Sequence, residues 1–300
     1  MMTPNSRLGL ALASGRPVVT AECLPPYGGD AGAVKALSAA LPASLDAVVV
    51  ADNPDGIRGS AVACAAILAG EGRQAVLSMV TRDRNRVALQ SDALGASALG
   101  VDAILCLSGD HQSLGICAQA AGVYDIDSMQ FAQALKRLNE EGLGFNGHKL
   151  DPLPKLTIGA VAHPYQKPLE LGLLRLRKKI AAGADFLLTQ AVFDVAEFAQ
   201  WMETVRAAGL DKRAAIIASV LPFASAEKAR EMQQRQTYGP VPESVIARLD
   251  QASNPAQEGV AIAAEAARQL KSMPGVRGIH ILCGGSESLA SAVIERAGLA

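Results

Sequence analysis

The stretch PVVTAECLPP, residues 17–26, joins a short apolar run to one carboxylate and two prolines. Residues 17–21 have the nearly continuous apolar character of a strand that is buried on both faces, as in parallel sheets. Glu22 comes next, and Pro25 and Pro26 stop the strand beyond it because proline cannot donate to a backbone ladder. The stretch predicts a buried strand that carries a carboxylate at its carboxyl end.

Seven further runs of this kind recur along the chain, and helix-like segments separate them. The runs are LDAVVVA (45–51), QAVLSMV (74–80), DAILCL (102–107), TIGAVA (157–162), DFLLTQ (185–190), AAIIASVL (214–221) and RGIHILC (277–283). Segments with helical apolar spacing, several of which end in glycine, cover residues 33–41, 59–72, 85–100, 129–142, 171–184 and 195–209. Eight strand–helix units in 300 residues predict an α/β fold, a single (β/α)8 TIM barrel over residues 1–300. A doubly wound open sheet is the alternative.

Two connections are longer than the others. Residues 142–156 follow the fourth helix, and residues 222–276 follow the seventh strand. Extra helices are predicted in the second connection at 225–235, 242–250 and 257–270. In the first connection, GLGFNG (142–147) matches the G-x-G-x-x-G spacing of dinucleotide-binding loops. It follows a helix and not a strand, so it lacks the context of that fingerprint, and we expect an ordinary loop.

The bulk composition narrows the class of protein. A formal net charge of -1 argues against a nucleic acid or an anionic membrane as the main partner. There is no run of 18 apolar residues, and the polar start MMTPNSR lacks the pattern of a secretory signal, so we expect a cytoplasmic protein. The five cysteines are odd in number and include no C-x-x-C pair, which predicts reduced, mostly buried thiols and no zinc site.

Polar residues or glycines follow nearly every predicted strand. Because the carboxyl ends of barrel strands meet at one rim, where barrel enzymes carry their chemistry, we expect these residues to form the site. They are Glu22, Asp52, Asn53, residues 81–85, Ser108, Gly109, Asp110, His163, Thr189, Gln190 and residues 283–285. Glu22 and Asp110 are the strongest candidates. Apolar neighbours would raise the pKa of Glu22 toward that of a usable acid, and Gly109 lets a ligand approach Asp110 closely.

The other candidates also have structural interpretations. Asp52 and Asp83 are equally well explained as helix N-caps, whose side-chain oxygens accept from backbone N–H groups. Arg82 and Arg84 fit either a solvated face or ion pairs. His163 precedes a proline, where a histidine is often a structural hydrogen-bonding residue.

A series of longer stretches runs almost from end to end of the chain. They are AECLPP (21–26), residues 81–110, VYDIDS (123–128), IGAVAHP (158–164), KKIAAGADFLLTQAVFD (178–194), SVLPFASAEKAREM (219–232) and GIHIL (278–282). In the residues of these stretches and in their order, the chain resembles the bacterial methylenetetrahydrofolate reductases, which are flavoproteins on a TIM barrel. The resemblance implies an FAD enzyme that reduces 5,10-methylenetetrahydrofolate to 5-methyltetrahydrofolate.

The resemblance also assigns roles to residues. Glu22 matches the catalytic acid, which protonates the folate as its methylene bridge opens. Asp110 matches a catalytic and substrate-binding aspartate beside flavin and pterin, and Gln190 matches a residue that contacts folate and, in NADH-using members, nicotinamide. The implied cofactor-binding residues are Asp52, Asn53, Ser78, Ser108, Gly109, Asp110, Tyr124, Asp125, His163 and Lys179. No metal is implied.

The chain departs from the family pattern at two places. Ser108 stands where many relatives have arginine, so one charged contact to the flavin is expected to be missing. Residues 283–285 replace an asparagine-containing stretch, which leaves the nicotinamide and folate-tail contacts open. The glycine pair 284–285 fits an anion nest at a helix N-terminus or a tight turn.

The electron donor is left open by the resemblance. NADH or NADPH is one possibility, and a partner subunit with iron–sulfur clusters, as used by some short members, is the other. A third interpretation is a pterin-binding barrel that transfers a methyl group without flavin. We expect a tetrahydrofolate derivative as the substrate, a homo-oligomer, and neither nucleic acid nor membrane as a partner.

Overall fold

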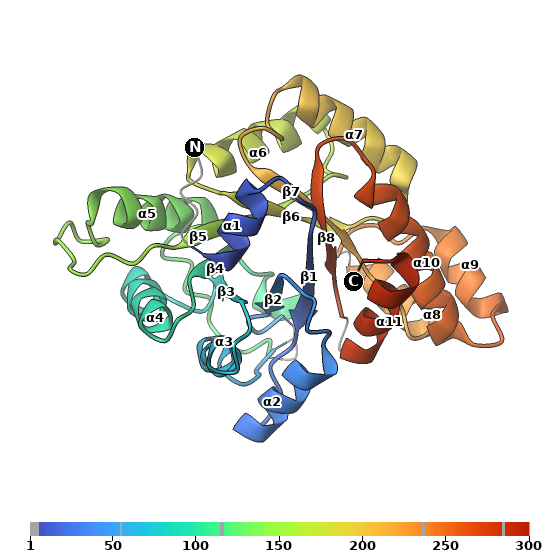
Figure 1. Ribbon diagram of the computed structural model, residues 1–300, viewed down its shortest axis with the longest axis horizontal. Coiled ribbons are helices and arrows are strands. Elements are labelled where there is room, and N and C mark those ends of the chain that lie inside the picture. The colour runs from blue at the N-terminus through green and yellow to red at the C-terminus, as the bar shows by residue number, and fades with distance from the viewer. Residues whose placement is uncertain (1–5, 55, 115–116, 236–237, 284–285, 300) are drawn as a thin grey trace.

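The computed structural model describes residues 6–54, 56–114, 117–235, 238–283 and 286–299. Eight parallel strands pair in chain order and close into a barrel, with β8 returning to β1 (Figure 1). The predicted TIM barrel is confirmed, and the open-sheet alternative is wrong. The strands are β1 (Val18–Cys23), β2 (Ala47–Val50), β3 (Ala75–Val80), β4 (Ala103–Leu107), β5 (Thr157–Ala162), β6 (Phe186–Ala191), β7 (Ala215–Val220) and β8 (Val276–Ile281).

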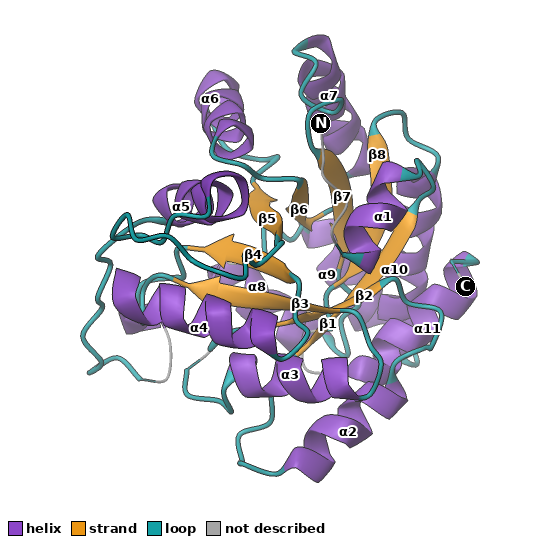
Figure 2. Cartoon of the chain, turned by 60° about the vertical axis from the view of Figure 1, so that its left-hand side comes forward, coloured by secondary structure: helices purple, strands orange, loops and turns teal. Residues whose placement is uncertain are grey.

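Helices surround the barrel on its outer side (Figure 2). Those that alternate with the strands are α2 (Ala31–Ala40), α3 (Ala61–Gly70), α4 (Arg86–Ala98), α5 (Ser128–Glu141), α6 (Leu169–Ala181), α7 (Val195–Ala207) and α11 (Glu287–Ala297). The long connection after β7 carries α8 (Ala226–Arg235), α9 (Glu243–Gln251) and α10 (Pro255–Lys271), as predicted. Local sequence sets their ends. The side chains of Asp127 and Gln130 form a capping box at the start of α5, and Gly142 ends that helix in the left-handed conformation.

The helix α1 (Arg7–Ala13) was not expected from the sequence. Ser6 caps it by accepting from the Gly9 N–H at 2.8 Å, and the Ser6 hydroxyl also bonds the Thr157 hydroxyl at 2.7 Å. The side chains of Leu8 and Leu12 are buried against residues at the starts of the strands. The helix therefore lies over the amino-terminal end of the barrel and closes it (Figure 1).

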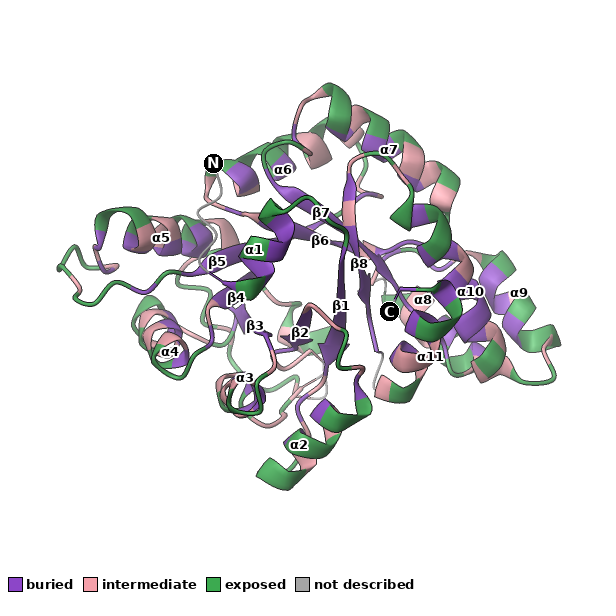
Figure 3. Cartoon of the chain, in the orientation of Figure 1, coloured by how far each residue is buried: buried purple, intermediate pink, exposed green. Residues whose placement is uncertain are grey.

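The interior of the barrel changes character along its axis. Toward α1 it is apolar, and Gly159 leaves room there for the ring of Phe186, which a Cβ would meet at 2.3 Å. The apolar residues are Val18, Ala47, Val49, Val76, Ala103, Leu105, Phe186, Leu188, Ala215 and Ile217. Toward the carboxyl ends of the strands, buried polar residues replace them: Thr20, Glu22, Ser78, Thr189, Ser219 and His280. The strands are buried along nearly their whole length (Figure 3), so these polar groups have little access to solvent except through a cavity.

Other expectations concern the loops and the thiols. The GLGFNG stretch forms a turn closed by an isolated bridge between Leu143 and Lys149, which agrees with an ordinary loop. All five cysteines are unpaired, and four of them, all but Cys117, are buried as predicted. Within the described ranges, no helix combines the length and the apolar composition that crossing a bilayer requires.

Candidate active site

A cavity of about 310 Å³ opens at the carboxyl ends of the strands, and all eight strands contribute to its lining. The site that the strand ends predict is therefore a real hollow in the structure. It brings together Glu22, Asp52, Asn53, Ser78, Ser108, Gly109, Asp110, His163, Lys179 and Gln190. Tyr124 and Asp125 do not line it.

Glu22 lies near the end of β1 and is 7% exposed. Its carboxylate accepts a hydrogen bond from the backbone N–H of Cys283 at 3.2 Å, and the Cys283 thiol donates to the Glu22 carbonyl at 2.6 Å. The segment after β8 thus fixes the position of this acid. Cys23 is fully buried among the apolar residues between the barrel and the helices. Residues 284–285 lie outside the described residues.

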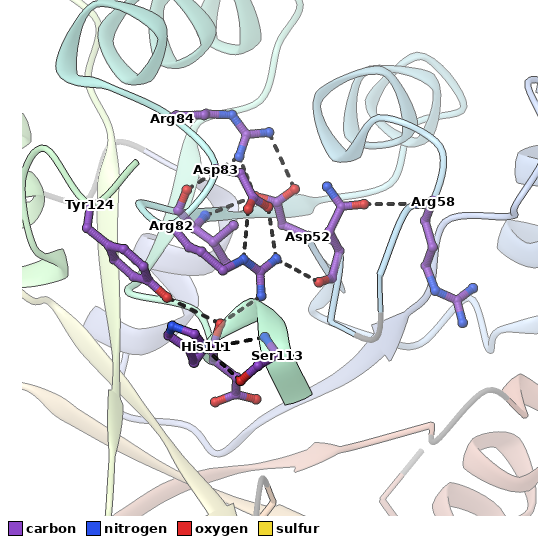
Figure 4. A network of polar contacts seen from close by, with 11 residues as sticks. Asp52, Arg58, Arg82, Asp83, Arg84, His111, Ser113 and Tyr124 are labelled. Carbon is purple, nitrogen blue, oxygen red and sulfur yellow. Dashed lines mark hydrogen bonds and ion pairs between the residues drawn. The ribbon is translucent and has the colours of Figure 1, made fainter. Parts of the chain in front are cut away.

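Asp52 is buried and holds a structural network together (Figure 4). Its carboxylate accepts from the backbone N–H of Val80 at 2.9 Å and from Arg84 at 2.6 Å, while Arg84 also bonds Asp92 at 2.8 Å. The bond between this carboxylate and the Arg84 guanidinium is strong, because hydrogen bonds between ionised groups are stronger than those between neutral ones. The carboxylate therefore ties the end of β2 to β3 and to the loop that follows.

The N-cap interpretation of Asp52 and Asp83 is wrong. Ser60 caps α3 and Asn85 caps α4, because each has its side-chain oxygen in reach of the third helical N–H. Asp83 instead forms an ion pair with Arg82.

Arg82 lines the cavity, and its donors bind three neighbouring segments (Figure 4). It binds the Asp83 carboxylate, the carbonyl of Asp110 at 3.0 Å and the carbonyl of Asn53 at 3.0 Å. The bond to Asp83 raises the pKa of Arg82, so the guanidinium is charged at any working pH. Of the alternatives for Arg82 and Arg84, the ion-pair interpretation is confirmed.

The turn after β4 forms the rim on this side. Gly109 has a φ of 80°, a conformation that glycine adopts readily, and the exposed Asp110 follows it. The Tyr124 hydroxyl donates to the Asp110 carbonyl at 3.4 Å, and the Ser108 hydroxyl donates to Ser128 at 3.0 Å. These bonds hold the backbone of the turn and leave the Asp110 side chain at the cavity.

Asp125 is engaged away from the cavity. Its carboxylate accepts two bonds from the Arg86 side chain and one from its backbone N–H, all between 2.8 and 2.9 Å. The Arg86 partner lowers the pKa of Asp125 to about 2. The roles that the resemblance gives to Tyr124 and Asp125 in binding the cofactor stay predictions.

The opposite wall carries His163, Lys179 and Gln190. Desolvation, with the charge of Lys179 nearby, lowers the pKa of His163 to about 4, although a hydrogen bond to the Gln190 side chain acts in the other direction. The imidazole is therefore neutral near pH 7. Lys179 donates to the Val161 carbonyl at 2.7 Å, and burial lowers its pKa to about 8. It is the cationic group on this wall, since most of it is protonated at pH 7.

The deep end of the cavity includes Thr189, which its place at a strand end predicted, and also Ser219 and His280, which the sequence analysis did not assign to the site. Thr189 donates to the Gln190 carbonyl at 2.8 Å and accepts from the Ser219 N–H at 3.0 Å. The His280 Nδ1 bonds the Thr20 hydroxyl at 2.9 Å, and burial lowers the pKa of His280 to about 3. A polar residue at an inward position of an otherwise apolar strand is the signal that marks Ser219 and His280.

The fold and the site together define a class of protein. A closed (β/α)8 barrel with a largely apolar cavity at the carboxyl ends of its strands, and with a few convergent polar groups, has the arrangement of a small-molecule site. The particular family follows from comparison. The chain belongs to the methylenetetrahydrofolate reductase family, whose sequence model matches residues 7–298.

Individual proteins are similar to part of the chain or to its fold. The chain is 36% identical over 101 residues to methylenetetrahydrofolate reductase 2 of Saccharomyces cerevisiae, a match that covers 31% of this chain and 16% of the yeast protein. A solved structure of an uncharacterized Clostridium thermocellum protein that binds two copies of 5-methyl-5,6,7,8-tetrahydrofolic acid has a TM-score of 0.64 at 14% identity, covering 97% of this chain and 99% of that one. A 2,3-dimethylmalate lyase structure has a TM-score of 0.52 at 14% identity, covering 98% and 85%. At these identities the two structures share the fold alone.

Proposed function

We propose that the protein reduces 5,10-methylenetetrahydrofolate to 5-methyltetrahydrofolate with a bound flavin. The observation that carries the proposal is the Glu22 carboxyl group, buried at the end of β1 in a cavity that also presents Asp110 and Gln190. Family membership supports the reaction type. The Clostridium protein of the same fold binds the product, 5-methyltetrahydrofolate.

Glu22 acts as the general acid. Reduction of the methylene bridge requires one proton and one hydride, and the proton goes to the nitrogen that leaves the bridging carbon. A carboxyl group within hydrogen-bond reach of that nitrogen delivers the proton as the bond breaks. The N–H of Cys283 keeps the carboxyl group in one orientation while it does so.

Asp110 and Gln190 orient the pterin. The carboxylate at the rim accepts hydrogen bonds from the amino and ring N–H donors of a pterin, and an amide both donates and accepts. Arg82 and Tyr124 hold the Asp110 backbone, so the carboxylate is presented without a large loss of side-chain freedom on binding.

The lining of the cavity fits the ring of a flavin. Some of the residues that the resemblance assigned to cofactor binding make structural contacts instead of facing the cavity freely. The walls are apolar, and Lys179 offers a positive charge near the cavity for an anionic phosphate tail. The carboxylates of Asp52 and Asp125 are bound to arginines, which favours a supporting role for these two residues, and their contact with the cofactor stays a prediction. A bound flavin supplies the hydride chemistry that side chains lack.

Anaerobic spectroscopy tests the proposal. We expect the purified protein to show the visible spectrum of a bound flavin. NADH or NADPH should reduce and bleach this flavin, and 5,10-methylenetetrahydrofolate should reoxidise it. Bleaching only by a reduced low-potential dye, followed by turnover, identifies a partner protein as the donor. Folded, colourless protein that takes up no FAD and reduces no folate contradicts the proposal and favours a flavin-free methyl-transferring barrel.

A further inference from the structure

Two polar residues on neighbouring strands, His280 on β8 and Ser219 on β7, form the floor of the cavity, and Thr20 on β1 lies behind them in contact with His280. The strand register pairs Thr20 with His280 and His280 with Ser219. Paired residues on adjacent strands are about 5 Å apart. Each of the three is no more than 2% exposed, and the side chains of Ser219 and His280 line the cavity.

Ser219 carries a buried hydroxyl group without a hydrogen-bond partner in the described part of the chain. An unpaired buried hydroxyl costs roughly 1–3 kcal/mol of desolvation, so native structures pair nearly all such groups with protein, water or ligand. Ser219 is one of the residues that line the cavity, and its hydroxyl, although covered in this structure, is close to whatever fills that cavity.

Neighbouring side chains do not satisfy this hydroxyl. The Thr189 hydroxyl donates to the Gln190 carbonyl and accepts from the Ser219 backbone N–H. The Nδ1 atom of His280 is engaged by the Thr20 hydroxyl, which leaves Nε2 as the ring atom available to the cavity. Ser219 offers one donor and two acceptor sites, and His280 offers one more polar atom beside it.

The side chains of the floor are polar but uncharged, so they favour an uncharged polar group of the ligand. Threonine, serine and a neutral imidazole carry no charge, and the neighbouring walls include Val49, Leu105 and Leu188. Burial of a phosphate against such groups without a cation is costly. An uncharged amide-type edge on a flat heterocycle has the donors and acceptors that match, and flavin and pterin rings both have one.

We propose that the Ser219 hydroxyl, with His280 beside it, hydrogen-bonds the amide-type edge of the heterocycle that fills the cavity. The inference rests on the proposed function for the identity of the ring. Flavin and folate share the required chemistry, and the experiment distinguishes them. Ser219 thereby becomes a ligand-binding residue at the floor, opposite the rim at Asp110.

The substitution Ser219→Ala tests this directly. Because the hydroxyl is unpaired within the described chain, its removal is expected to leave the Tm of ligand-free protein unchanged or higher. Ligand affinity is expected to fall about tenfold, the usual size of one lost hydrogen bond of roughly 1.4 kcal/mol. Binding of FAD and of 5-methyltetrahydrofolate to the ligand-free protein is measured separately, by flavin fluorescence quenching and by calorimetry.

A matched control lies nearby. Thr81 is also fully buried with an unpaired hydroxyl, but it does not line the cavity. Thr81→Val should therefore leave both affinities unchanged. A loss confined to FAD in Ser219→Ala identifies the flavin as the ring on the floor, and a loss confined to folate identifies the pterin; either result supports the proposal.

Other results overturn it. Equal affinities of wild type and Ser219→Ala for both ligands show that the hydroxyl binds only water, and this leaves the proposed reductase function intact if wild type turns over. Wild-type protein that binds neither ring contradicts the floor contact and the proposed function together. A similar loss in Thr81→Val attributes the effect to the barrel as a whole and also contradicts the proposal.

Discussion

At the scale of single residues, the environment of each carboxylate separates chemistry from structure. Glu22 is buried at the cavity and bonded by one backbone N–H, whereas Asp52 accepts an arginine and a backbone N–H. Asp110 is exposed at the rim, with its backbone held by neighbours. The three carboxylates of one lining are thus suited to donate a proton, to bind the loops together and to meet a ligand.

Glu22→Gln is expected to separate the two half-reactions. The amide is nearly isosteric and still accepts from Cys283, so the fold, flavin binding and flavin reduction by the donor should be retained. Loss of a general acid lowers folate reduction by about 10²–10⁴-fold. Stopped-flow measurement of flavin reduction and of its reoxidation by methylenetetrahydrofolate checks this. Equal losses in both half-reactions would contradict an acid role.

Asp52→Asn is expected to act on stability. The Asp52 side chain is 1% exposed and Arg84 is 14% exposed, and removal of one charge from a buried pair costs roughly 3–5 kcal/mol because the other charge is left unpaired. We expect a loss of roughly 2–4 kcal/mol in the free energy of unfolding, measured by urea denaturation. Asp125→Asn is the matched control, since that pair with Arg86 is exposed to solvent and should contribute little to stability. Similar losses in both variants would contradict the structural role of Asp52.

At the scale of elements, the loops after β2, β3 and β4 form part of the rim of the cavity, whereas α1 packs against the opposite end of the barrel. The loops are tied to one another by Arg82 and Arg84, so the rim behaves as one connected unit (Figure 4). Helix α1 contributes to the opposite end, where its leucines complete the apolar interior. Substitutions at the two ends should therefore separate ligand binding from stability.

Leu12→Ala tests the contribution of α1. Leu12 is 2% exposed, and replacing a buried leucine by alanine costs about 2–5 kcal/mol through lost burial and the cavity left behind. The free energy of unfolding should fall by that amount, while folate affinity of the folded fraction stays unchanged. Leu10→Ala, on the exposed face of the same helix at 56% exposure, should stay within about 0.5 kcal/mol. A large loss in Leu10→Ala, or none in Leu12→Ala, would contradict this packing.

At the scale of the whole molecule, the barrel was predictable because its signals are local. Each buried strand is a run of β-branched and apolar residues, and eight such runs alternate with helical spacing. Helix α1 was missed because a segment of seven residues with few charges shows only a weak helical spacing of its apolar residues. Its stability comes from packing against strands that are distant in the sequence.

The site was predictable in part for the same reason. Strand ends are local features, so many of the residues that they mark line the cavity, whereas Ser78 and Lys179 were assigned through the family resemblance. The partners of Arg82, Arg84 and Asp125 depend on which loops meet in space, which spacing along the chain does not encode. Ser219 and His280 lie inside strands, where a single polar residue is easily taken for packing.

The stability of the whole molecule should depend on pH through His163, whose folded-state pKa is lowered. The pKa of His163 is about 4 in the folded protein, against about 6.5 in an unfolded chain, so between these values the unfolded state binds more protons. Stability therefore rises with pH through this window and is lost as pH falls from about 6.5 to 4. His163→Asn should reduce the loss of stability between pH 7 and pH 4, by a small amount because the exposed side chain is screened by solvent. Urea titrations of both proteins across this range measure it, and parallel pH profiles would contradict it.

Because α1 covers the amino-terminal end of the barrel, the cavity lies at the carboxyl ends of the strands, where Asp110 and Gln190 both line it. Two bulky reactants that need the same position beside one ring exclude each other from it. We therefore expect a high concentration of either reactant to inhibit binding of the other.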